Sequence, residues 1–213
     1  DTIYEGVHKL LPGEKLVFEA GRITRAHYWR LAYNINPAWT MDDAADAYLE
    51  LLTDAVRLQR VSDVPLGAFL SGGLDSSSVV GLLSLMSTQP VKTFSIGFDD
   101  AQADELRFAR AAARHFQTDH TEAVLRPDMI DTASRLVRYF GEPFADSSAL
   151  PTWLVSQVAR EKVTVALSGG GGDELFAGYT WAQRNHQVGR YRRFPVALRR
   201  LAEALFEREV LSA

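Results

Sequence analysis

The 213-residue chain is 46% hydrophobic and 23% charged, an ordinary globular composition that suits one large domain or a domain with an attached piece. It has no cysteine, which excludes a disulfide framework, a thiolate zinc site and a cysteine nucleophile, and which fits the cytoplasm as the expected location. A net charge of -4 gives no general attraction to nucleic acid or to an anionic membrane, and no apolar run approaches the roughly 20 residues of a membrane span.

The first 39 residues are rich in turns and in short β-like runs. The runs "KLVFEAG" (15–21) and "RAHYWRLAY" (25–33) are followed by a break at Asn36 and Pro37. This pattern predicts the end of a β-rich unit, or a linker packed on one, before a second domain over 40–213. The opening "DTIYEGVHKLL" has neither a start methionine nor a signal-peptide pattern, so we expect a piece of a longer chain.

From Thr40 the pattern changes to alternating helices and strands. Thr40, with Asp43 three residues later, predicts a capping box at the start of a helix over 40–60. Apolar runs predict strands over 64–70, 91–98, 120–125 and 163–168. Helical spacing of apolar residues predicts helices over 76–86, 103–117, 127–140 and 151–161, and another from 173 to 185. This alternation predicts an α/β fold, in which a parallel sheet carries helices on both faces.

Three unusual loops follow the first, second and fourth predicted strands, at 71–77, 97–100 and 168–173. The carboxyl ends of parallel strands share one edge of the sheet, and ligands bind there where the strand order reverses. The sequence therefore predicts that these loops build a single site.

The first loop, "SGGLDSS" (71–77), has the features of a phosphate-binding turn. Its glycines are Gly72 and Gly73, and its hydroxyl donors are Ser71, Ser76 and Ser77. Glycines allow a close approach of the backbone, and the N-terminus of the following helix favours an anion. A carboxylate at Asp75 would repel phosphate unless a divalent cation bridges the two. The alternative is a glycine turn capped by Asp75 and Ser76, with no ligand.

The second loop, within "SGGGGDELFAGY" (168–179), carries four consecutive glycines before two acids. Four glycines cost backbone entropy on folding, which predicts a close approach to another group. Asp173 could be a second ligand of a cation that faces Asp75. The alternative is that Asp173 and Glu174 only interact with the dipole of the next helix.

These motifs carry a resemblance to a known family. "SGGLDSS" resembles the pyrophosphate loop of the N-type ATP pyrophosphatases. With "TFSIGF", "GEPFADSSALPT" and "LSGGGGDELFAGY" following in order, nearly all of 40–185 resembles the synthetase domain of glutamine-dependent asparagine synthetases. The opening "EGVHKLLPGEKLVFEAGRITRAHYW" resembles the tail of that family's glutaminase domain and the linker beyond it. The resemblance implies an adenine nucleotide alpha hydrolase-like (Rossmann-like) fold, with the strands in the order third, second, first, fourth.

The resemblance also implies a reaction and a set of site residues. ATP and Mg²⁺ would adenylate a carboxylate, aspartate or a related acid, and ammonia would then displace AMP to give an amide. Loop 71–77 would hold the pyrophosphate, and Asp75 and Asp173 would ligate Mg²⁺ as the catalytic acids. The residues implied at the adenosine pocket are Phe69, Ile96 and Gly97, and those touching the nucleotide from the second loop are Ser168 and Gly169. The implied partner is a glutaminase domain missing from this chain, and a homo-oligomer is left open.

The sequence departs from the family's pattern in three ways. The family has an acid at the third position of the second loop, where this chain has Gly170. The chain stops at Ala213, before the family's C-terminal region, and it contains no glutaminase domain, so we expect a fragment. The alternatives are a related ligase that forms a lactam or acts on a peptide or glycan precursor, an ATP- or AMP-binding fragment without turnover, and a structural module whose glycine loops are only turns.

Two further groups of polar residues have more than one interpretation. Asp146, Ser147 and Ser148 could form a substrate-side loop or could cap the helix that starts near Pro151. The side chains at 120 and 122 alternate on a short strand, and we expect a structural role for this histidine and glutamate rather than a catalytic one.

Overall fold

The computed structural model describes residues 2–98, 106–125, 129–144, 146–182, 184–185, 189 and 195–196. In chain order its elements are β1 (Glu14–Glu19), β2 (Arg22–His27), α1 (Met41–Gln59), β3 (Leu66–Phe69), α2 (Leu74–Leu85), β4 (Lys92–Phe98), α3 (Leu106–His115), β5 (Asp119–Leu125), α4 (Met129–Phe140), α5 (Ala149–Arg160), β6 (Val165–Leu167) and α6 (Gly172–Phe176).

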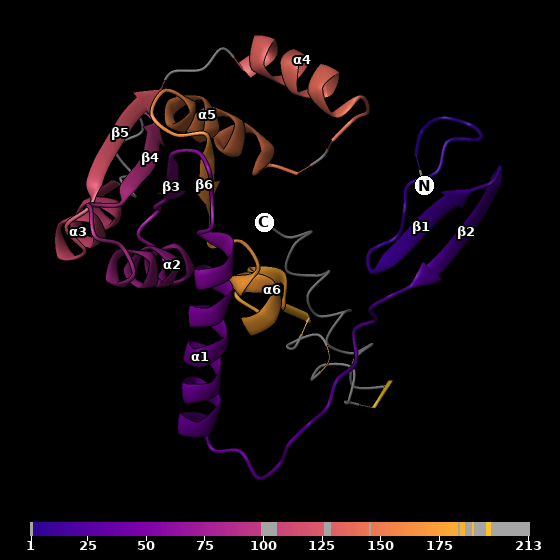
Figure 1. Ribbon diagram of the computed structural model, residues 1–213, viewed down its shortest axis with the longest axis horizontal. Helices are drawn as coiled ribbons and strands as arrows, with labels where there is room; N and C mark the ends of the chain where they lie inside the picture. Colours follow the sequence, from indigo (N-terminus) through magenta and orange to yellow (C-terminus); the bar gives the residue numbers. More distant parts are fainter. Residues whose placement is uncertain are drawn as a thin grey trace, which may run out of the picture.

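Four of the strands form a parallel sheet in the order β5-β4-β3-β6 (Figure 1). Counted along the chain, these are the third, second, first and fourth strands of the predicted set, so the predicted order is confirmed. Strands β4 and β5 follow β3 in one direction across the sheet, whereas β6 lies on the other side of β3. The strand order therefore reverses beside β3.

Helices cover both faces of this sheet, which confirms the predicted α/β class. One core joins α1, α2 and α3 to the sheet through Val56, Val80, Leu83, Ala109 and Leu70. A second core, on the other face, packs Ala159 of α5 against Phe94 of β4, and α4 lies against α5. Phe94 is completely buried, as an apolar side chain in a central strand should be.

The first long helix begins where the sequence predicts. Thr40 is the N-cap of α1, and its hydroxyl accepts a hydrogen bond of 3.1 Å from the backbone N–H of Asp43. The Asp43 carboxylate accepts one of 2.9 Å from the N–H of Thr40 in return, which completes the capping box. Leu51 and Leu58 remain exposed, so only part of the apolar face of α1 packs on α2.

The first residues form a two-stranded antiparallel hairpin of β1 and β2, drawn apart from the main sheet (Figure 1). The φ angles of Ala20 and Gly21, 47° and 76°, are both positive, as in the tight turns that match the twist of a hairpin. The second strand is Arg22–His27, so the strand expected over 25–33 is wrong beyond residue 27. Nearby, the Tyr4 hydroxyl donates to the carbonyl oxygen of Gly141 at 2.7 Å, which places the segment before the hairpin against the loop after α4.

Several predicted boundaries also need correction. Helix α2 starts at Leu74 rather than at residue 76, because Gly73 is its N-cap, and β6 covers only 165–167 of the expected 163–168. The helix expected over 173–185 is interrupted: α6 ends at Phe176, since Ala177 turns to the left-handed region with φ 54°, and helical backbone resumes over 180–182 and 184–185. The predicted positions 99–105, 126–128 and most of those after 182 lie outside the described residues.

Within the described part of the chain, no helix is both long enough and apolar enough to cross a membrane.

Candidate nucleotide site

The two glycine loops lie together at the point where the strand order reverses. The first follows β3 and the second follows β6, and these two strands are neighbours in the sheet. Both loops therefore lie side by side at the carboxyl edge of the sheet, which is where open α/β sheets bind their ligands. Of the third loop, predicted at 97–100, residues 97 and 98 are still part of β4, whose carboxyl end lies at the same edge, and residues 99 and 100 lie outside the described residues.

The first loop is held by its own hydroxyl groups and by α3. The Ser76 hydroxyl is buried; it lies 2.9 Å from the Ser71 hydroxyl and accepts a hydrogen bond of 3.2 Å from the Ser71 N–H. The Ser71 hydroxyl in turn accepts from the N–H of Gly73 at 3.2 Å. Gly72 has φ 82°, and a Cβ there would come within 2.4 Å of the backbone N of Ala109 in α3. The loop is therefore a fixed turn in which Ser76 serves an internal role.

Of the two residues predicted to cap this turn, only Ser76 does so, because its hydroxyl accepts from the Ser71 N–H and donates to the carbonyl oxygen of Gly73 at 3.3 Å. The N-cap of α2 is Gly73, which offers no side-chain hydrogen bond, and Asp75 lies inside the first turn of the helix. Asp75 is only partly buried and lines the adjoining cleft. The interpretation of the loop as a turn capped by Asp75 and Ser76 therefore holds for Ser76 and not for Asp75, whose carboxylate lines the cleft beside the positive end of the helix dipole.

The second loop packs closely on the first at two of its four glycines. A Cβ on Gly169 would lie 2.5 Å from the backbone N of Ser76, and one on Gly172 would lie 2.2 Å from the Asp75 Cγ. Position 171 favours glycine for another reason, because its φ of 107° is one that other residues rarely adopt. Gly169 and Gly172 thus make the predicted close approach, and the group approached is the start of α2.

The two loops border an open cleft of about 600 Å³. The predicted site residues that line it are Phe69, Ser71, Gly73, Asp75, Ser76, Gly169 and Asp173. Asp173 lies in the first turn of α6. Its Oδ1 packs on Gly178, where a Cβ would lie only 2.0 Å from that oxygen. The cleft therefore brings together the two acids that the sequence singled out.

These acids supply two carboxylates to one cleft. Among the described residues, no three His, Asp or Glu side chains gather as a complete set of metal ligands. A pair of carboxylates fits Mg²⁺, which keeps several waters and takes further oxygen ligands from the phosphates of its nucleotide. Asp75 and Asp173 would be the residues that hold it.

A second hollow of about 430 Å³ adjoins the cleft and shares Phe69 and Ser71 with it. It contains the other two residues expected around adenosine, Ile96 and Gly97. Gly97 is required here because a Cβ would lie 2.6 Å from the Leu106 Cδ1. The cleft is lined largely by loop residues and acids, whereas this hollow is flanked by apolar side chains of β4, α3 and α5, as the sugar–base part of a nucleotide requires.

Some predicted site residues do not line either hollow, and some lining residues were not predicted. Gly72 is covered by α3, Ser77 borders neither hollow, and Ser168 lines a cavity of about 360 Å³ behind the second loop. The residues that the sequence analysis missed include Leu74, Phe176 and Gly178 in the cleft, and Ser95, Leu106, Pro151, Thr152 and Val155 in the apolar hollow. Pro151 and its neighbours come from the "GEPFADSSALPT" motif, which could have indicated them.

The loop before α5 makes its own local turn. Asp146 Oδ1 accepts a hydrogen bond of 2.8 Å from the Ser148 N–H, which lowers the pKa of the Asp146 carboxyl. Ser148 is the N-cap position of α5, but its side chain makes no capping bond. Across the site, the Tyr179 hydroxyl donates to Glu174 at 2.6 Å, and this bond is the main cause that raises the pKa of Tyr179 to about 12. Both Glu174 and Tyr179 are thereby committed to holding the turn after α6.

Two larger hollows lie elsewhere and lack these features. One of about 780 Å³ is bordered by Pro65, Leu66 and Lys92, at the amino ends of β3 and β4. The other, of about 830 Å³, lies between α4 and α5 and is lined by aromatic side chains such as Tyr139 and Trp153. Neither contains a glycine loop or a pair of acids.

The family model for asparagine synthase matches residues 47–213, which include both glycine loops and all four strands of the parallel sheet. The chain belongs to the asparagine synthase family. This confirms the resemblance stated from the motifs.

Individual relatives agree with the family model. The chain is 37% identical over 202 residues to a putative glutamine-hydrolyzing asparagine synthetase 2 of Methanocaldococcus jannaschii, a match that covers 93% of this chain and 39% of that protein. It is 32% identical to asparagine synthetase 1 of Bacillus subtilis, over 94% of this chain and 32% of that one. The chain therefore spans about a third of the length of these curated relatives. Among solved structures, an NH₃-dependent NAD synthetase from Campylobacter jejuni overlaps 63% of this chain and 60% of its own, at 16% identity and a TM-score of 0.42.

Proposed function

We propose that this asparagine synthase-family chain is the ATP-dependent part of an amide-forming ligase, which adenylates a small carboxylic acid, aspartate or a related acid, for attack by ammonia. The observation that carries the proposal is the contact between the two glycine loops, where Gly169 packs on Ser76 and Gly172 packs on Asp75. This contact brings a helix N-terminus and two acids to one cleft beside an apolar hollow.

In the first step, a carboxylate oxygen of the acceptor attacks the α-phosphorus of ATP, the bond from that phosphorus to the bridging oxygen breaks, and pyrophosphate leaves with the electron pair. The N-terminus of α2, within loop 71–77, would hold the leaving pyrophosphate, because the first N–H groups of a helix and its dipole stabilise that negative charge. Bound at Asp75 and Asp173, Mg²⁺ would supply further charge neutralisation. Phe69, with Ile96 and Gly97 beside it, would orient the adenosine.

In the second step, the nitrogen of ammonia attacks the acyl carbon, the carbon–oxygen bond to AMP breaks, and the nitrogen releases a proton. The resemblance assigns the supply of ammonia to a glutaminase domain, with residues 1–39 as its end and the linker. Exposed apolar side chains in the hairpin, Phe18 and Ile23 among them, support a neighbour for this segment.

Pyrophosphate exchange tests the proposal. The 213-residue chain is incubated with MgATP, labelled pyrophosphate, ammonia-free buffer and one carboxylic acid at a time, and label appearing in ATP is measured. The proposal predicts exchange that depends on the acid, with aspartate first to be tried. Binding of MgATP without exchange for any acid would contradict the adenylation step.

The second candidate is a nucleotide-binding fragment without turnover, which Gly170 favours. Gly170 lines the cleft at the position where the family has an acid, and a Cβ there would meet only the Ser168 hydroxyl, at 3.5 Å. The backbone at this position therefore has room for a Cβ. If this candidate is right, the natural chain binds MgATP without exchange and Gly170→Glu restores exchange. If adenylation needs no acid here, Gly170→Glu leaves the exchange rate unchanged.

A further inference from the structure

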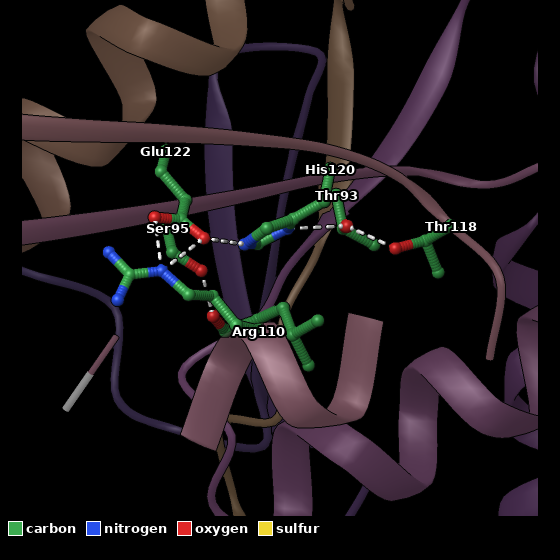
Figure 2. A network of polar contacts seen from close by, with 7 residues as sticks. Thr93, Ser95, Arg110, Thr118, His120 and Glu122 are labelled. Atoms are coloured by element: carbon green, nitrogen blue, oxygen red, sulfur yellow. Dashed lines mark hydrogen bonds and ion pairs between the residues drawn. The ribbon is translucent and has the colours of Figure 1, made fainter. Parts of the chain in front are cut away.

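A row of polar side chains lies between α3 and the sheet, close to the cleft but outside it. On the strands, Thr93 is paired in register with His120, and Ser95 with Glu122 (Figure 2). Thr93 is completely buried and Ser95 nearly so. Arg110 reaches this row from α3. Polar groups in such a position cost free energy unless each has a partner, so the row calls for an explanation beyond packing.

The hydrogen bonds of this row can all point in one direction, toward the His120 ring. Thr118 lies 2.8 Å from the Thr93 hydroxyl, and Thr93 lies 2.8 Å from the Nδ1 of His120. If each hydroxyl donates toward the ring, the proton of His120 stands on Nε2 and faces Glu122 Oε1 at 3.4 Å. Burial lowers the pKa of His120 below its usual value, with Glu122 acting in the opposite direction, so the ring is neutral at pH 7.

The row ends in an ion pair between the sheet and α3. The Nε of Arg110 donates to both carboxylate oxygens of Glu122, at 3.0 and 2.8 Å. The side chain of Arg110 is 40% exposed and that of Glu122 24%, so the pair adds little to stability. What this contact adds is geometry: one N–H of Arg110 is shared between both carboxylate oxygens of Glu122, which ties the helix to the strand at this point.

The position of α3 matters at the nucleotide site. Its first residue, Leu106, packs on Gly97, and the backbone of Phe108 and Ala109 packs on Gly72 of the first loop. Arg110 is the next residue along the chain. The other buried side chains of α3 are Ala109 and Ala113, which belong to the main core together with the partly buried Ala112 and with Phe116 just beyond the helix. The ion pair of Arg110 adds a directional polar contact to this apolar packing.

We infer that Arg110 and Glu122 are positioning residues of the nucleotide site: their ion pair fixes α3, and α3 fixes the loop that starts at Ser71. Ser95 reinforces the same loop, because its hydroxyl donates to the carbonyl oxygen of Leu70, the residue before Ser71. The expected effect on nucleotide binding rests on the proposed function, whereas the expected effect of the ion pair on the loop does not.

Four variants of the full chain test the inference: Glu122→Gln, Arg110→Gln, the double variant, and Asp54→Asn as control. Asp54 forms an exposed ion pair with Arg57 on α1, with 55% and 59% of these side chains accessible, and it lines neither hollow. Each variant is first compared with the natural chain by urea unfolding and circular dichroism.

Calorimetry then measures the dissociation constant of MgATP. We expect about a fivefold increase in Glu122→Gln and in Arg110→Gln, and no further increase in the double variant, since residues of one network are not additive. Asp54→Asn should bind like the natural chain. A folded Glu122→Gln chain with unchanged MgATP affinity, when the natural chain binds MgATP, would overturn the inference.

Hydrogen exchange separates this inference from the proposed function. The amides of Leu70, Ser71 and Gly73 are protected by bonds within the site, to Phe94, Ser76 and Ser71 respectively. In Glu122→Gln these amides should exchange at least about fivefold faster than in Asp54→Asn, because a shifted α3 releases the loop. If the natural chain binds no MgATP, the proposed function fails, but hydrogen exchange still tests the link from the ion pair to the loop. Equal exchange rates in Glu122→Gln and Asp54→Asn would overturn the inference.

Discussion

The carboxylate of Asp75 rests directly on the Cα of Gly172, with its Cγ 2.2 Å from where a Cβ would stand and its two oxygens 2.3 and 2.4 Å away. One residue comes from the first turn of α2 and the other from the start of α6. The contact joins the two glycine loops at the cleft. It also fixes the direction of a carboxylate that we propose to hold Mg²⁺.

A methyl group at position 172 should therefore disturb the metal site more than the fold. In Gly172→Ala the Asp75 side chain has to rotate away, which costs little stability because it is a flexible chain end. We expect MgATP affinity to fall about tenfold or more, the scale on which disturbed metal ligation acts.

The matched control is Gly170→Ala, whose new Cβ meets only the Ser168 hydroxyl at an ordinary 3.5 Å. Calorimetry with MgATP compares the two variants. Equal affinities in Gly172→Ala and Gly170→Ala would show that the orientation of Asp75 does not matter for binding.

A substitution at Gly72 should instead act on stability. Its φ of 82° is unfavourable for alanine, and the new Cβ would meet the backbone of Phe108 and Ala109, which cannot rotate away. Gly141 has a similar φ of 72° but open space around it. Comparing the two variants therefore isolates the effect of the clash. We expect Gly72→Ala to lower the free energy of unfolding by about 2 kcal/mol more than Gly141→Ala does, as measured by urea denaturation. A difference near zero would mean that α3 does not press on the loop.

Much of this arrangement follows from the sequence because it depends on local signals. Thr40 and Asp43 set the start of α1, and the apolar runs place the strands of the parallel sheet. The glycines of both loops mark a close approach, since nothing else accounts for four in a row. The partner in that approach was not predictable: the contact between Gly172 and Asp75 depends on how two helices meet across β3 and β6.

Other features depend on tertiary contacts or on strained backbone that leave little trace in the chain. The alternation of His120 and Glu122 indicates a shared face, but not Arg110, which comes from α3. The early end of α6 results from the positive φ of Ala177, a residue with no preference for that conformation. Ser76 follows the pattern of a phosphate ligand, but in the fold its hydroxyl is turned inward to Ser71.

Acid should weaken the fold partly through His120. Burial lowers the pKa of His120 in the folded chain from its usual 6.5, and Arg110, which also faces it, acts in the same direction against Glu122. As the pH falls below about 6.5, the unfolded chain gains this proton first, so the free energy of unfolding decreases until the folded-state pKa is reached. Well above pH 6.5, His120 is neutral in both the folded and the unfolded chain, so it no longer makes the free energy of unfolding depend on pH.

Urea denaturation at pH 7.5, 6.5 and 5.5 measures this slope. We expect a shallower slope in His120→Gln than in the natural chain. Identical slopes in the natural chain and in His120→Gln would contradict a buried, neutral His120.

The most direct test of the central claim is calorimetry of MgATP and of Mg²⁺-free AMP, carried out on the natural chain and on Asp75→Asn. The proposed site predicts that the natural chain binds both, and that Asp75→Asn loses about tenfold or more in affinity for MgATP while AMP binding hardly changes, because only the first uses the metal. No binding of MgATP to the natural chain, or an equal loss for both nucleotides in Asp75→Asn, would contradict the claim that these two glycine loops form a metal–nucleotide site.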